Sequence, residues 1–130
     1  LPPEGTVWRY AIAPTPVNSG DRRLYHKTTA RAFYDEALKA VAGCDEVIFV
    51  NERGEITEGS RTNVFVERDG VWLTPPLTSG LLDGCLRREL IERGPQRVVE
   101  QVLGVEDLAT GQAWFGNALR GLVRGERYQP

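Results

Sequence analysis

The chain has 130 residues, of which 41% are hydrophobic and 26% are charged, a composition typical of one globular domain. Its formal net charge of −2 and its pI near 5.5 argue against nucleic acid as a partner. No apolar run is long enough to span a bilayer and no secretory signal opens the chain, so we expect a cytoplasmic protein without a membrane partner.

The few cysteines and the single histidine limit the possible chemistry. Cys44 and Cys85 lie far apart, without a second Cys or His at metal-ligand spacing, and His26 is the only histidine. A zinc site built by the protein and a Ser-His-Asp triad are therefore both disfavoured. We expect both thiols to be small buried apolar residues in a reducing compartment.

The first part of the chain predicts a strand, a loop and a helix. Residues 6–13 are typical of a strand, and residues 14–24 contain two prolines and an Asn-Ser-Gly turn signal. A helix is predicted from Thr28 or Thr29, and Gly43 supplies its stop. Its apolar positions share one helical face: Phe33, Ala37, Leu38 and Val41.

The middle of the chain predicts a meander of strands. The expected strands are 46–50, 55–57, 63–67 and 71–74. Asp69-Gly70 is a hairpin signal between the last two. The loop 74–84 is rich in proline and glycine, and it leads into a predicted helix at 85–93 that Gly94-Pro95 ends.

The remainder predicts further short elements. They are a strand at 97–103, a helical turn at 105–109, a strand at 113–116, a polar step at 117–121 and an extended piece at 122–125. Because strands and helices mix without a regular βαβ alternation, we predict a mixed α/β (α+β) domain with a curled mixed sheet. No internal repeat is present.

Three polar steps could carry chemistry: Lys27 before the first long helix, Glu58 leading Gly-Ser-Arg-Thr-Asn, and the Gly84 loop before the second helix. Each alone is an ordinary surface or turn feature. Together they supply what a phosphorylated pyridine cofactor needs: an amine, a carboxylate for the ring nitrogen, and backbone donors for phosphate. Lysine, with a reference pKa of about 10.4, would need burial or a positive neighbour to act as a nucleophile. Glu58 would stay ionised through its pair with the pyridinium.

Four segments, in this order, resemble the successive motifs of the class IV aminotransferases, the fold-type IV pyridoxal phosphate enzymes. They are HKTTAR, DEVIFVNERGEITEGSRTNVFV, TPPLTSGLLDGCLR and FGNALRG. Within that family the forms NERGEITEGSRTNVF and GNALRGL are most similar to the 4-amino-4-deoxychorismate lyases. The resemblance implies a barrel-like mixed sheet with flanking helices. It also implies that residues 1–130 form a single domain, equivalent to the C-terminal, lysine-bearing half of such an enzyme.

The resemblance also implies roles for individual residues. Lys27 would be the catalytic, Schiff-base lysine and Glu58 the partner of the pyridine nitrogen of pyridoxal 5'-phosphate. The remaining cofactor-binding residues would be Ser60, Arg61, Thr62 and Asn63 along the cofactor, Gly84, Cys85 and Leu86 at the phosphate, and Asn117 and Ala118 on the phosphate and substrate side. The chain departs from the family pattern at Leu86, where threonine is frequent, and at Asp83, which replaces proline.

The implied activity is elimination of pyruvate from a small-molecule substrate to give 4-aminobenzoate, a folate precursor. Transamination of a branched-chain or D-amino acid is the alternative within the family. A non-catalytic binding or assembly domain is an alternative of another class. Because the family's N-terminal domain is missing, we expect a fragment that forms a homodimer or associates with the missing domain. Nucleic-acid binding is disfavoured despite several arginines: Arg87, Arg88, Arg93, Arg120 and Arg124.

Overall fold

A computed structural model describes residues 5–20 and 27–129 of the chain, and of residues 27–30 it describes the backbone alone. The strands are β1 Val7–Ile12, β2 Glu46–Val50, β3 Ile56–Gly59, β4 Asn63–Arg68, β5 Val71–Thr74, β6 Arg97–Glu100, β7 Gln112–Asn117 and β8 Gly121–Arg127. The helices are α1 Lys27–Lys39, α2 Cys85–Arg93 and α3 Asp107–Thr110, with a 3-10 turn at Leu77–Ser79. The end of the predicted loop, residues 21–24, and the single histidine, His26, lie outside the described residues.

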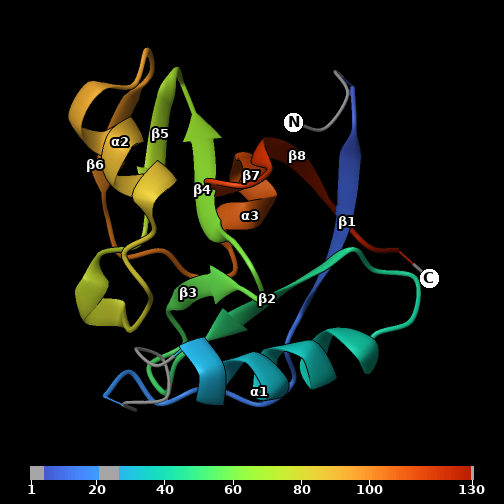
Figure 1. The fold of residues 1–130 in the computed structure, drawn as a ribbon. Coiled ribbons are helices and arrows are strands. Elements are labelled where there is room, and N and C mark those ends of the chain that lie inside the picture. Colours follow the sequence, from blue (N-terminus) through green and yellow to red (C-terminus); the bar gives the residue numbers. More distant parts are fainter. Residues whose placement is uncertain (1–4, 21–26, 130) are drawn as a thin grey trace.

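The strands form one curled mixed sheet that closes on itself (Figure 1). Its order is β3-β2-β1-β8-β7-β4-β5-β6, and β3 also pairs with β4. Within the described part of the chain, this extra pairing closes a barrel of β3, β2, β1, β8, β7 and β4, while β5 and β6 extend outward from β4. The pairs β1–β2, β1–β8 and β5–β6 are parallel, and the others are antiparallel. The predicted α+β, barrel-like mixed sheet is therefore confirmed.

The strand predicted at 97–103 is shorter than expected. Only 97–100 pairs with β5, although the Gln101 amide still donates to the Thr74 carbonyl. The carbonyl of Leu103 then accepts a hydrogen bond from the Ile56 amide at 2.7 Å. The chain thus leaves the edge of β5 for the end of β3, which the local sequence does not predict.

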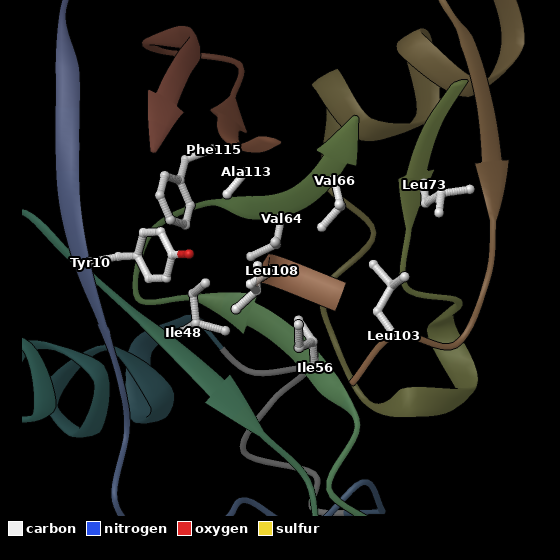
Figure 2. Close-up of a cluster of buried hydrophobic side chains, with 10 residues drawn as sticks. All are labelled: Tyr10, Ile48, Ile56, Val64, Val66, Leu73, Leu103, Leu108, Ala113 and Phe115. Atoms are coloured by element: carbon white, nitrogen blue, oxygen red, sulfur yellow. The ribbon is translucent and has the colours of Figure 1, made fainter. Parts of the chain in front are cut away.

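The barrel interior is a cluster of buried apolar side chains that point toward one another (Figure 2). Its members are Tyr10, Ile48, Ile56, Val64, Val66, Leu73, Leu103, Leu108, Ala113 and Phe115. Phe115 has no exposed surface, and its ring meets that of Tyr10 edge-on, with 5.6 Å between centroids. Leu108 brings the short helix α3 into the same cluster.

The outer faces of the central strands are covered by helices, because successive side chains of a strand point to opposite faces. Val47 and Phe49 of β2 pack against α1 with Tyr34, whereas Ile48 between them points into the barrel. Phe65 of β4 likewise packs outward, against Trp72 of β5 and Leu90 of α2. Burial on both faces explains the continuous apolar runs of β2 and β4.

We predict that the barrel depends on Phe115. Phe115→Ala should lower the free energy of unfolding by about 3–5 kcal/mol, because the cavity that it leaves lies among rigid neighbours. Val102→Ala is the control, since that side chain is 51% exposed, and it should change stability by less than about 0.5 kcal/mol. Urea unfolding of the three proteins measures both values, and equal midpoints would contradict the prediction.

Candidate functional site

A cavity of about 600 Å³ lies where four separate segments meet. Its walls come from α1, the turn between β3 and β4, the loop leading into α2, and the turn between β7 and β8. The predicted site residues that line it are Glu58, Ser60, Arg61, Thr62, Asn63, Gly84, Cys85, Asn117 and Ala118. The fold thus gathers into one cavity positions that are up to 60 residues apart in the sequence.

Two predicted site residues need separate treatment, because the side chain of one is not described and that of the other does not line the cavity. Lys27 is the first residue of α1, and its side chain lies outside the described part. Arg31 and Tyr34 of the same helix do line the cavity. Because residues four and seven positions apart share a helical face, position 27 lies on the face of α1 that borders the cavity. Leu86 instead packs its side chain against the cluster of Phe65, Trp72 and Leu90.

Glu58 is the buried carboxylate of the cavity, with 4% of its surface exposed. It accepts hydrogen bonds from the Tyr34 hydroxyl at 3.0 Å and from the Leu82 amide at 3.2 Å. Burial raises the pKa of Glu58 to about 8, although these two hydrogen bonds and the charge of Arg31 oppose the rise. Glu58 therefore holds a proton at neutral pH unless a cation lies beside it. Its predicted ionisation by a pyridinium stays a prediction.

The loop before α2 is held against Asn63. The Asn63 side-chain amide donates to the Leu82 carbonyl at 2.9 Å. A Cβ atom on Gly84 would lie 2.6 Å from Asn63 Oδ1, so glycine is required here for close approach. Gly84 is the N-cap of α2, and among the described side chains none caps this helix end. The first amides of α2 are therefore available to an anion in the cavity.

Charged groups at this end of the cavity are mostly basic. Asp83, which departs from the family pattern, pairs with Arg87 at 2.9 Å and with Arg88 at 3.5 Å. Its negative charge is therefore offset by two guanidinium groups. Arg88 also lines the cavity, as do Arg31 and Arg61. The charge balance of the lining suits an anionic ligand.

Asn117 connects the β7–β8 turn to the β3–β4 turn. Its side-chain amide donates to the Arg61 carbonyl at 2.8 Å, and its Oδ1 accepts from the Arg120 amide at 2.7 Å. The guanidinium groups of Arg61 and Arg120 lie 5.8 Å and 5.6 Å from the centroid of the Trp8 ring. Both cations thus rest on one aromatic side chain beside the cavity.

The sequence interpretation missed Glu46, which has no exposed surface. Its carboxylate accepts hydrogen bonds from the Ser60 amide at 2.8 Å, from Thr62 Oγ1 at 2.9 Å, and from the Ser60 hydroxyl. Glu46 does not line the cavity, but it binds the turn that does. The only signal in the sequence is an acidic residue at the start of an otherwise apolar strand.

The expected burial of both cysteines is wrong for Cys85. Cys44 is half-buried and Cys85 is exposed, and neither forms a disulfide. Cys85 is exposed because it is the first residue of α2 and faces the cavity. Among the described residues, no group of His, Cys, Asp and Glu side chains could hold a metal ion. Over residues 5–20 and 27–129, no helix has the length and apolar character that a membrane crossing requires.

The fold and the cavity define a barrel-type α+β domain whose cavity is lined by a buried carboxyl group and by a helix N-terminus. The family model for amino-transferase class IV matches residues 2–128. The chain therefore belongs to the class IV aminotransferases, a family of pyridoxal-phosphate-dependent enzymes. The family and the cofactor class expected from the four motifs are confirmed.

Individual relatives carry two kinds of name. The "Putative aminodeoxychorismate lyase" of Schizosaccharomyces pombe is 33% identical over 106 residues, which cover 77% of this chain and 46% of that protein. The "Probable branched-chain-amino-acid aminotransferase" of Thermotoga maritima is 38% identical over 92 residues, which cover 68% of this chain and 34% of that protein. A crystal structure from Mesorhizobium loti, named "Putative amino-acid aminotransferase", is 41% identical with a TM-score of 0.86, and the match covers 95% of this chain and 61% of that one. The chain spans less than half the length of these two curated relatives.

We predict that burial of Glu58 makes stability fall as pH rises. Between pH 4.5 and about 8 the unfolded chain releases this proton and the folded chain keeps it. The free energy of unfolding should therefore fall by about 1.4 kcal/mol per pH unit in this window, relative to Glu58→Gln, which has no such proton. Urea unfolding of both proteins at pH 5, 6.5 and 8 measures the difference. Parallel pH profiles would show that Glu58 has an ordinary pKa.

Proposed function

We propose that this chain is the cofactor-binding half of a pyridoxal-phosphate-dependent 4-amino-4-deoxychorismate lyase. The observation that carries the proposal is that Glu58 and the start of α2, at Gly84 and Cys85, line one cavity. Among the described residues Glu58 forms no ion pair, and its raised pKa of about 8 leaves it suited to a cationic partner. The first amides of α2 suit the phosphate group. The residues present therefore fit pyridoxal 5'-phosphate.

The residues of the chain divide the work. Pyridoxal 5'-phosphate, when bound, supplies an electron sink for a carbanion at the amine-bearing carbon of the substrate. Glu58 would hold the proton at the pyridine nitrogen, and Tyr34 and the Leu82 amide keep its carboxylate in place. The amides of Cys85 and Leu86 would bind the phosphate. Lys27 would hold the cofactor through its aldehyde carbon. Once the substrate amine has displaced it there, the freed Lys27 amine would accept the proton from the substrate carbon.

The other predicted residues would shape the pocket. The hydroxyls of Ser60 and Thr62 donate to Glu46, so these residues would meet the cofactor chiefly through their backbone. Asn63 and Gly84 hold the loop before α2 close to the turn. Asn117 fixes the neighbouring turn, which would place Ala118 on the substrate side. Arg61 would add positive charge near the mouth of the cavity.

Transamination of an amino acid is the second candidate function. The names of the Thermotoga maritima relative and of the Mesorhizobium loti structure favour it. It would use the same Lys27 and Glu58, so the described site is compatible with both reactions. The names alone support the lyase equally, through the Schizosaccharomyces pombe relative.

The reaction products distinguish the two candidates. A lyase releases pyruvate from 4-amino-4-deoxychorismate without an added oxo acid. A branched-chain aminotransferase forms glutamate from 2-oxoglutarate and a branched-chain amino acid. We propose that activity also needs a second copy or an N-terminal domain, because the chain spans under half of its curated relatives. Both assays should therefore be run with and without the N-terminal domain of a related lyase. Glutamate formation without pyruvate release would overturn the proposed lyase activity and support the aminotransferase instead.

We predict that Lys27 alone bonds to the cofactor. Incubation with pyridoxal 5'-phosphate and borohydride should attach one reduced cofactor to the wild-type protein and to Lys39→Ala, but none to Lys27→Ala. Lys39 is the matched control, because it is the only other lysine and ends the same helix, about 18 Å further along at 1.5 Å per residue. Peptide mass spectrometry locates the adduct. A defined adduct in Lys27→Ala would refute the assignment, and no adduct in any protein would favour a non-catalytic domain.

A further inference from the structure

Glu46 carries a buried charge that the proposed chemistry does not use. It is the first residue of β2 and has no exposed surface. Besides the Ser60 and Thr62 groups, its carboxylate accepts from the Val47 amide at 2.9 Å and from the Arg61 amide at 3.4 Å. Within the described part of the chain it forms no ion pair. Among the described residues, the donors to this carboxylate are therefore all neutral.

A carboxylate is chemically suited to this position. Four of its donors come from three consecutive residues, Ser60 to Thr62, so the turn wraps around one acid group. A carboxylate only accepts hydrogen bonds, whereas a glutamine amide would present an NH₂ group to part of this donor set. Gly59 completes the fit, because a Cβ atom there would lie 2.7 Å from Glu46 Oε2.

The turn that Glu46 holds also fixes the direction of Glu58. The Gly59 amide donates to the Thr62 carbonyl at 2.8 Å, which closes the turn directly after Glu58. Glu58 lies opposite Asn63 in the β3–β4 pairing. Asn63 in turn holds Leu82, whose amide donates to Glu58. Displacement of the turn would therefore move the Glu58 carboxylate and its hydrogen-bond donor together.

We propose that Glu46 is a positioning residue that acts through Glu58: its buried carboxylate holds the 59–62 turn so that Glu58 faces the pyridine nitrogen of the cofactor. This inference rests on the proposed function. Beyond burial, the main cause, the negative charge of Glu46 also raises the pKa of Glu58. Geometry and charge thus act in the same direction, since both strengthen the pairing of Glu58 with a protonated ring.

A double-mutant cycle on cofactor affinity tests this proposal. The dissociation constant of pyridoxal 5'-phosphate is measured by equilibrium dialysis for wild type, Glu46→Gln, Glu58→Gln and the double variant. We expect Glu46→Gln to weaken binding about tenfold when Glu58 is present and less than about twofold in the Glu58→Gln background, because the two residues act as one unit. Equal weakening in both backgrounds would mean that Glu46 only supports the fold, and no weakening would refute its role.

Two further variants keep the test decisive. Thr62→Val removes one hydrogen bond to Glu46 without changing the side-chain shape, so it replaces Glu46→Gln if that protein does not fold. It should show the same dependence on Glu58, with a weakening of about threefold. Glu55→Gln is the matched control, because it makes the same chemical change in the same hairpin but away from the cavity. It should leave affinity unchanged. If the wild-type protein does not bind the cofactor, the proposed function fails, independently of Glu46.

Discussion

The hydrogen bonds between the Glu46 carboxylate and residues 60–62 organise the cavity. The amides and hydroxyls of the turn donate to one acid group, and the carbonyls of Ser60 and Arg61 accept hydrogen bonds from other segments. Arg31 of α1 donates to the Ser60 carbonyl, and Asn117 donates to the Arg61 carbonyl. Segments distant in the sequence therefore dock onto one short turn, and the cavity walls depend on its conformation.

The burial of apolar side chains in the barrel offsets the energetic cost of burying the acid groups of the site. Two buried acid groups, Glu46 and Glu58, lose solvation free energy that hydrogen bonds to neutral donors only partly restore. The adjacent strands β2, β3 and β4 are buried on both faces, and their apolar side chains offset this cost. Glu58 and Asn63 also lie at the paired ends of β3 and β4. A rigid sheet, rather than a loop, therefore aims the site.

Local patterns in the sequence predict the strands, both long helices and the polar steps, because alternation, helical periodicity and turn residues act over short distances. They do not predict that Glu46 is buried, since its donors lie about 15 residues further along the chain. The sequence analysis also missed the exposure of Cys85 and the crossing of residues 101–103 toward β3, because both depend on segments that are distant in the sequence. The four family motifs did point to the residues that line the cavity. A motif shared by a family reflects contacts between distant segments, which local periodicity cannot show.

The two departures from the family pattern have different physical consequences at the start of α2. The Leu86 side chain packs on Phe65, Trp72 and Leu90, so this position anchors the helix to the sheet and offers an anion only its amide. Asp83 also lines the cavity and adds a negative charge there, but its salt bridges to Arg87 and Arg88 offset that charge. Arg87 is itself buried and is held by the Pro75 carbonyl and Glu100. A phosphate bound at the start of α2, as we propose, would therefore depend on backbone amides and on the position of α2, not on a hydroxyl side chain at position 86.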